Sequence, residues 1–193
     1  RRQRQMCIRD SSFGVGMWTS WLSQASFSFR YDRGTEINYD PAAGLDYFLG
    51  DETKLDVGMH LRPFTSLRID NTYIFSRLQE RQTGANIFNN HIARSKINYQ
   101  FNRELSFRII LQYENLLPNP NFTSLTTRKR FTGDFLITYM VNPGTVLYVG
   151  YNDILENLDP RLLEVDDELL RTRRKFLERG KQFFIKFSYL FRF

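Results

Sequence analysis

Apolar and polar residues alternate along most of this chain, in short segments separated by polar connections. The clearest segment is 105–114, where the odd positions are apolar and the even positions include Arg108 and Glu114. A period of two is typical of a strand with one buried face. Seven further segments repeat it, at 24–31, 54–62, 67–76, 93–101, 131–141, 146–151 and 183–193. The pattern therefore predicts eight antiparallel strands.

The connections between these segments alternate between short and long. Tight turns are predicted at 63–66, 102–104 and 142–144, and Asn142-Pro143-Gly144 has strong turn chemistry. Long polar links are predicted at 32–52, 79–90, 115–130 and 154–180. Outer-membrane barrels have short periplasmic turns and longer outer loops. We therefore expect the tight turns on the periplasmic side of an up-and-down meander and the long links outside.

The last link leaves two alternatives open. Asp159-Pro160 resembles a helix start, Gly180 supplies a stop, and apolar residues between them have helical spacing. This pattern predicts a helix within 160–179. The same stretch is rich in acids and bases of nearly balanced number, which fits a disordered loop equally well.

Composition narrows the fold class. Hydrophobic residues make up 41% of the chain and aromatic residues 16%, which favours many short half-buried surfaces over one thick core. No stretch approaches the roughly 18 to 20 apolar residues of a membrane helix. The signal of a membrane strand is weaker and alternating. The sequence therefore predicts an all-β fold, an antiparallel up-and-down transmembrane β-barrel of about eight strands, as the C-terminal part of a larger barrel.

The first residues differ from the rest. Residues 1–11 show no alternation and contain the single cysteine, Cys7, so no disulfide or metal-thiolate site is expected. Residues 1–10 contribute half of the formal net charge of +6. We interpret 1–11 as a non-native or artefactual segment and 12–193 as the C-terminal outer-membrane β-barrel region. The natural protein is then expected to extend further toward its N-terminus.

The final segment carries the most specific signal. Its alternating aromatic and aliphatic residues resemble the insertion signal that the barrel-assembly machinery reads in outer-membrane proteins. The residues of this membrane-insertion strand are Ile185, Phe187, Tyr189, Phe191 and Phe193. Outer-membrane lipid, lipopolysaccharide and the barrel-assembly machinery are the partners it implies. The alternative is an ordinary amphipathic strand.

Several motifs also resemble one family. They are 97–106, 142–145, 148–151 and 183–193. They are similar to the C-terminal barrel region, a domain of unknown function, of bacterial envelope proteins that carry an N-terminal carbohydrate-binding family-9-like module. The resemblance spans roughly 13–193. It implies a bacterial outer-membrane location and a link to carbohydrate binding or uptake through an N-terminal module, and it supplies no catalytic residues.

Charged residues on the polar side of the predicted strands are candidates for lining a lumen. They are Lys54, Asp56, His60, Arg62, Arg68, Asp70, Arg94, Lys96, Arg108, Glu114, Asp134, Lys186 and Arg192. They predict either a pore or binding surface, or mixed charges that pair across neighbouring strands. We favour pairing, because neither sign dominates as a selective ring requires.

No catalytic, cofactor or metal site is expected. His60 and His91 are the only histidines, and their spacing matches no metal or nucleophile pattern. The predicted function is an integral outer-membrane β-barrel protein of the structural or transport class. The alternatives are a barrel-embedded enzyme and a soluble basic β-sheet protein. Binding of nucleic acid is not expected, since acids are interleaved with the bases.

Overall fold

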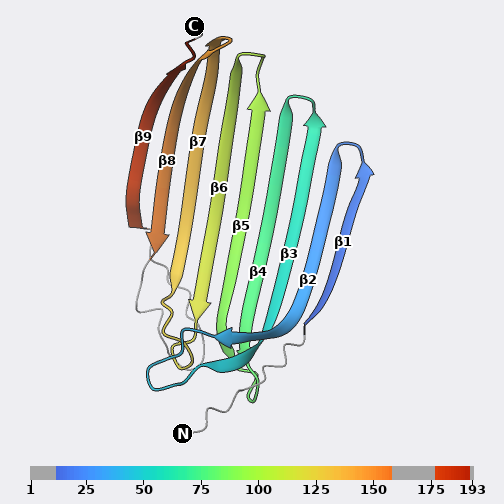
Figure 1. Cartoon of the computed structure of the whole chain (residues 1–193), viewed down its shortest axis with the longest axis vertical. Coiled ribbons are helices and arrows are strands. Elements are labelled where there is room, and N and C mark those ends of the chain that lie inside the picture. The colour runs from blue at the N-terminus through green and yellow to red at the C-terminus, as the bar shows by residue number, and fades with distance from the viewer. Residues whose placement is uncertain (1–11, 158–176, 192–193) are drawn as a thin grey trace.

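The computed structural model describes residues 12–157 and 177–191, and these form one antiparallel sheet of nine strands in sequence order (Figure 1). The strands are β1 (Phe13–Leu22), β2 (Ala25–Asn38), β3 (Phe48–Phe64), β4 (Leu67–Glu80), β5 (Asn86–Gln100), β6 (Leu105–Pro118), β7 (Arg128–Asn142), β8 (Thr145–Asn157) and β9 (Leu177–Tyr189). The all-β, antiparallel, up-and-down architecture predicted from alternation is confirmed.

One strand was not predicted. The alternation predicts about eight strands, but β1 precedes them and pairs with β2. Its apolar row, which includes Phe13 and Met17, alternates with Gly14, Gly16 and Trp18. Two glycines and a tryptophan in the row expected to be polar hide the period of two. In the part of the chain that the structure describes, no helix is long and apolar enough to cross a membrane.

The connections are sorted by length, as predicted. Short turns at 23–24, 65–66, 101–104 and 143–144 lie at one end of the sheet, and longer links at 39–47, 81–85 and 119–127 lie at the other (Figure 1). We call these the turn end and the link end. Gly144 takes a φ of 112°, which explains why glycine closes the β7–β8 turn.

The links are shorter than predicted. The strands β2 to β9 contain 13 to 17 residues and continue well into the segments expected to be long loops. The apolar rows stop there, so the sequence alone shows no further alternation. The helix considered within 160–179 falls mostly outside the described residues, and β9 already begins at Leu177.

The register gathers the predicted apolar rows on one face. Directly opposed residues of neighbouring strands project to the same side of a sheet. One such row is Leu61, Ile69, Ile97, Ile109, Phe135, Tyr151 and Phe183. The adjacent row on the other side is Ser26, His60, Asp70, Lys96, Ile110, Asp134 and Asn152. We call these two sides the apolar face and the polar face.

The sheet is open, and a closed barrel is not shown. Among the described residues, β1 pairs only with β2, and β9 pairs only with β8. The strands alternate in direction, so β1 and β9 both run from the link end to the turn end. The two free edges are therefore parallel to each other.

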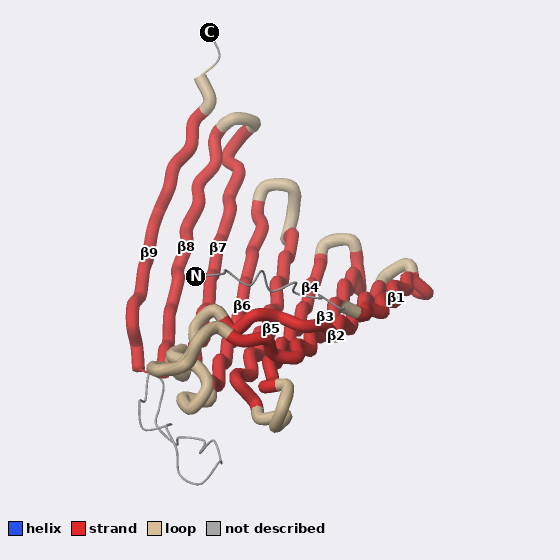
Figure 2. The backbone as a smooth tube through the Cα atoms, turned by 60° about the horizontal axis from the view of Figure 1, so that its bottom comes forward, coloured by secondary structure: helices blue, strands red, loops and turns tan. Residues whose placement is uncertain are grey.

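Fully buried side chains are few and gather at the link end. Leu78 and Ile87 are the only buried hydrophobic residues in the described part of the chain. There the ends of β2 and β3 and the link between them lie across the ends of the neighbouring strands (Figure 2). Pro41 forms an isolated bridge with Thr123 of the β6–β7 link. Within residues 12–157 and 177–191, the sheet itself has no core on either face.

Candidate functional site

The polar face carries the charged residues that were predicted to line a lumen. The register and alternation place Lys54, Asp56, His60, Arg62, Arg68, Asp70, Arg94, Lys96, Arg108, Glu114, Asp134 and Lys186 on this face. Arg192 lies outside the described residues. These side chains come from six strands, β3 to β7 and β9, so they form a surface rather than a single cluster.

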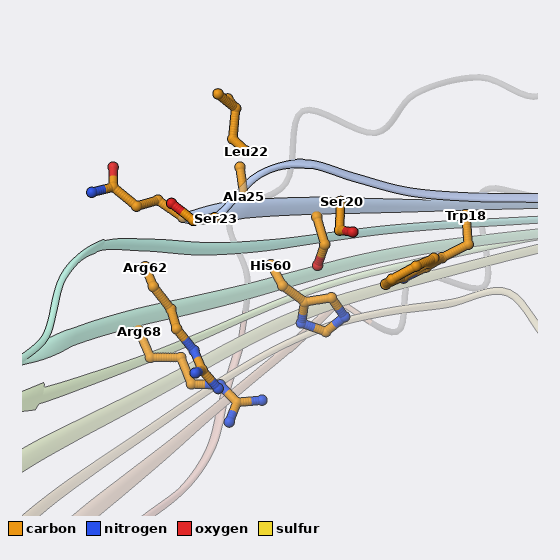
Figure 3. Close-up of a pocket in the computed structure, with 10 residues that line it drawn as sticks. Trp18, Ser20, Leu22, Ser23, Ala25, His60, Arg62 and Arg68 are labelled. Atoms are coloured by element: carbon orange, nitrogen blue, oxygen red, sulfur yellow. The ribbon is translucent and has the colours of Figure 1, made fainter.

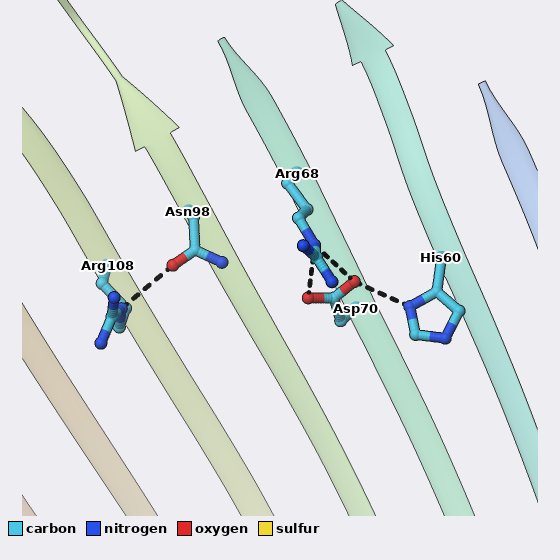
Figure 4. Close-up of polar contacts among 5 residues, drawn as sticks. All are labelled: His60, Arg68, Asp70, Asn98 and Arg108. Atoms are coloured by element: carbon cyan, nitrogen blue, oxygen red, sulfur yellow. Dashed lines mark hydrogen bonds and ion pairs between the residues drawn. The ribbon is translucent and has the colours of Figure 1, made fainter. Parts of the chain in front are cut away.

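A compact charged group lies near the turn end, on β3 and β4. The imidazole Nδ1 of His60 lies 2.8 Å from Oδ1 of Asp70, and the Arg68 Nε donates to both carboxylate oxygens of Asp70 at 3.0 and 2.9 Å (Figure 4). Asp70 is thus held by two partners. Arg68 and Asp70 form an ion pair within β4, and His60 reaches Asp70 from the neighbouring strand.

The register also brings a serine, a histidine and an aspartate into line. Ser26 lies directly opposite His60, which lies directly opposite Asp70. Ser26 and His60 line a hollow of about 460 Å³ with Trp18 and Arg62 (Figure 3). Spacing along the chain gave no sign of this order, because the three residues come from three strands.

This arrangement does not make an activated nucleophile. Activation of a serine needs a hydrogen bond to a base that a third group orients. Within the described residues, no hydrogen bond joins Ser26 to His60, and Arg68 occupies both oxygens of Asp70. The group is therefore an ion-paired cluster beside a hollow.

Two arginines on the next strands are held by amides. Nε of Arg108 donates to Oδ1 of Asn98 at 3.0 Å (Figure 4), and Nε of Arg94 donates to Oε1 of Gln112 at 2.9 Å. No carboxylate lies within ion-pair distance of Arg94 or Arg108 in the described part of the chain. An amide fixes the guanidinium without cancelling its charge.

The positive and negative charges of the polar face are separated along the strand direction, between the turn end and the link end. The dividing line is the row that contains Thr72, Arg94 and Gln112. From this row to the turn end, the described charged residues, counting His60 as neutral, are the cations Arg62, Arg68, Arg94, Lys96, Arg108 and Lys186 and the acids Asp70 and Asp134. Toward the link end they are the cations Arg30, Lys54, Arg128 and Arg130 and the acids Asp32, Glu36, Glu52, Asp56, Glu80, Glu114 and Glu156. One sign thus dominates each half, a distribution that the sequence did not predict because the two signs are nearly balanced over the whole face.

The apolar face forms a band beside the turn end. On each strand from β2 to β9 the row changes from apolar to polar toward the link end. The last apolar residues are Tyr31, Leu55, Phe75, Ala93, Tyr113, Phe131, Tyr151 and Phe183. The next residues on this face are Arg33, Thr53, Arg77, His91, Asn115, Lys129, Asp153 and Lys181. The band has a continuous edge across eight strands.

Side chains of the band are exposed where they lie on edge strands. On β9, Ile185 and Phe187 are each 64% exposed and Tyr189 is 54% exposed. Phe191 follows the strand and packs against Tyr189, with ring centroids 4.5 Å apart. Phe193 lies outside the described residues. Large exposed apolar surfaces of this kind mark an interaction site.

The histidines form no metal site. In the residues that the structure describes, no group of histidine, cysteine and carboxylate side chains is arranged to hold an ion. His91 lies at the edge of the apolar band, where its Nδ1 is 2.8 Å from the Tyr73 hydroxyl. Its ring packs against Phe75. The environment of His91 is therefore aromatic.

Glu80 organises the short link between β4 and β5. Its carboxylate accepts hydrogen bonds from the Thr83 hydroxyl at 2.7 Å and from the Thr83 and Gln82 backbone N–H groups at 2.6 and 3.0 Å. These bonds hold the pKa of Glu80 below its usual value of 4.5. Glu80 therefore stays ionised and keeps the link closed.

Comparisons with known proteins assign this chain to no family. No protein-family model, curated protein or solved structure matches this chain.

Proposed function

We propose that this chain is part of an integral outer-membrane β-barrel protein of the structural or transport class. The apolar face lies against lipid, and the polar face lines the interior. One observation carries the proposal: an apolar band, interrupted only at the paired residues Asn71 and Ser95 of β4 and β5, crosses strands β2 to β9, and no core lies behind it in the described residues. In water this surface would remain exposed, whereas lipid covers such a face in a membrane barrel.

The height of the band fits a membrane. On β6 the band runs from Leu105 to Tyr113, which is about 26 Å along the strand at a rise of about 3.3 Å per residue. Outer-membrane barrels present an apolar band about 25 Å tall. A strand inclined to the membrane normal would cross slightly less than its own length.

The edge of the band gives the inclination. The offset between two edge residues can be measured along β4. Leu55 on β3 lies in the same register row as Phe75 of β4, and Phe183 on β9 lies in the same row as Ile69 of β4, so the two rows are six residues apart. That is a shift of about 20 Å over about 29 Å of sheet, or an angle of about 35°. Barrel strands are tilted by about 35–45°. A level membrane boundary would cut these strands along this edge.

Aromatic residues lie at both boundaries of the band. Tyr31, Tyr113, Phe131 and Tyr151 are at the edge toward the links, and Phe64, Tyr99, Phe101, Tyr139 and Tyr189 are near the turns. Aromatic girdles of this kind lie at membrane interfaces. Arg33, Arg77, Lys129 and Lys181 follow just beyond the link-side edge, at the level expected for the phosphates of lipopolysaccharide.

Closure of the barrel requires further strands. The edges β1 and β9 run in the same direction, so pairing them directly would give a parallel ladder. If a second copy were related by a rotation about the barrel axis, its β1 would lie parallel to β9 of the first copy, so the new pair would also be parallel. An antiparallel barrel thus needs an odd number of additional strands. This agrees with even strand numbers in bacterial barrels and with the expectation of a larger barrel.

The orientation follows from the connections. The short turns would face the periplasm and the links would lie outside. The backbone N–H of Leu190 donates to the Gly144 carbonyl at 2.7 Å, which keeps the end of β9 at the turn end. An insertion signal for the barrel-assembly machinery would therefore be presented on the periplasmic side. The link to carbohydrate binding or uptake stays a prediction.

The test is the behaviour of the full chain with and without detergent. We expect it to aggregate in detergent-free buffer, to fold in detergent or lipid vesicles, and to migrate differently on a gel before and after boiling. A monodisperse, detergent-free monomer would contradict the proposal and favour the soluble alternative.

A further inference from the structure

A hollow of about 430 Å³ lies on the polar face across strands β5 to β8. We propose that this hollow binds an oxyanion, either a carboxylate or a phosphate. Its main groups are Arg94, Lys96 and Arg130, with Thr132 and Asp134 beside them. The proposal rests on the proposed function for the role of the polar face as an interior, but not for the binding itself.

The charge of the hollow favours an anion. Three cations line it and one carboxylate accompanies them. In the described part of the chain, none of the three cations has a carboxylate within ion-pair distance. Asp134 accepts a hydrogen bond from Asn152 of the neighbouring strand. No ion pair in the described residues thus neutralises these three cations, although the acids Glu114 and Glu156 lie opposite Arg130 in the register.

One of the donors, the Arg94 guanidinium, is fixed before a ligand arrives. The bond from Arg94 Nε to Gln112 holds this guanidinium against β6. Lys96 and Asp134 lie in one register row, and Arg94 and Thr132 lie in the next. Cations from β5 and a cation from β7 therefore border the same space from two sides. A preorganised site loses less entropy on binding.

Arg130 provides an independent observation. Its Nε is buried and has no hydrogen-bond partner. Buried polar groups are almost always bonded, and an unsatisfied charged donor is especially unfavourable. An oxyanion in the hollow would supply the acceptor, through the short charge-assisted bonds that guanidinium groups form with carboxylate and phosphate.

The surroundings extend the positive potential. Arg108, which is held by the Asn98 amide, lies in the adjoining row toward the turn end, in the half of the face where cations dominate (Figure 4). A surface of one sign beside low-dielectric walls concentrates ligands of the opposite sign. The mixed composition of the whole face obscures this, because the acids lie mostly in the other half.

The experiment measures anion binding to the full chain folded in detergent. Inorganic phosphate and acetate are titrated separately by calorimetry, which distinguishes the two sources of oxyanion. The variants are Arg94→Gln, Lys96→Gln and Arg130→Gln. The matched controls are Lys54→Gln and Arg30→Gln, which remove the same charge from the same face but from pairs with Glu52 at 2.8 Å and Asp32 at 3.4 Å.

We expect saturable binding of at least one anion, weakened about tenfold or more by each variant at the hollow, since a bond to a charged group is lost. The controls should change the affinity less than about twofold. Absence of saturable binding, or equal weakening by the controls, would overturn the proposal. The Lys96 side chain forms no hydrogen bond or ion pair in the described residues, so its loss should not affect folding. If an arginine variant fails to fold, the affinity of Lys96→Gln therefore tests the proposal.

Gel migration of the same samples separates this proposal from the proposed function. A sample that binds anions but migrates identically before and after boiling supports the site and contradicts the barrel. A heat-modifiable sample that binds neither anion overturns the site and leaves the barrel standing.

Discussion

A lysine placed in the middle of the apolar band tests whether this face meets lipid. Ile109 and Ile110 are neighbours of the same type on β6, and they project to opposite faces. Ile109 lies midway between Leu105 and Tyr113, about 13 Å along the strand from either boundary. With an inclination of about 35°, its side chain would lie about 11 Å inside the membrane.

Ile109→Lys should therefore be strongly destabilising. A lysine at the midplane of a barrel costs about 2–4 kcal/mol, which corresponds to a roughly 30- to 700-fold change in the folding equilibrium. Ile110→Lys is the matched control. Its cross-strand neighbours are Lys96 and Asp134, which oppose each other in charge, so we expect a change within about 1 kcal/mol.

The assay is urea-dependent folding into lipid vesicles, followed by gel migration without boiling. Equal effects of the two substitutions, or a larger effect of Ile110→Lys, would refute the assignment of the two faces. A neutral or stabilising Ile109→Lys would indicate that the apolar face lies in water, because a lysine improves the solubility of an exposed apolar sheet.

Three further predictions concern particular contacts. Thr123→Val should remove the 2.6 Å bond from the Thr123 hydroxyl to the Asp40 carbonyl and destabilise the link by about 1–2 kcal/mol, seen as faster proteolysis within 39–47. Gly150→Ala should destabilise the β8–β9 pair by about 1–3 kcal/mol in urea titrations, because the added methyl would overlap the Phe184 ring. The stability that Glu80 contributes to its link should be complete above pH 4.5 and lost as the pH falls through its lowered folded-state pKa, measured by hydrogen exchange of the link amides.

Two of these predictions have a control variant, and the third has a contradicting outcome. Gly16→Ala places a methyl at an ordinary distance of 3.8 Å from the Phe29 carbonyl oxygen, so it should be much milder than Gly150→Ala. Thr83→Val should abolish part of the pH dependence at Glu80. Unchanged proteolysis in Thr123→Val would show that the bridge between the two links is not held by this hydroxyl.

Most strands could be predicted from the sequence because each has one apolar face and one polar face. The alternation of Leu105, Phe107 and Ile109 with the residues between them is the direct result of these two faces. Strand β1 was missed since Gly14 and Gly16 stand where polar side chains were expected. The ends of the strands were also missed, because beyond residues such as Tyr31 and Phe75 both faces are polar and alternation vanishes.

The candidate sites depend on the register between strands, which was not readable from the alternation alone. The approach of His60 to Asp70 requires β3 and β4 to be aligned by their turn. The hollow of Arg94 and Arg130 requires two further alignments, across β6. The sign of each charge is evident from the sequence. The separation of cations and acids into two halves of the polar face depends on the register between strands.

Spin labels along β6 test the central proposal most directly. Single cysteines at 105–113, in a Cys7→Ser background, are labelled and the protein is folded into lipid vesicles. The proposed arrangement predicts that collision with oxygen, which partitions into lipid, is high at odd positions and low at even positions, with the maximum at Ile109. Collision with a water-soluble nickel chelate should show the opposite alternation. Absence of alternation, or odd positions that meet the chelate rather than oxygen, would contradict a lipid-facing band.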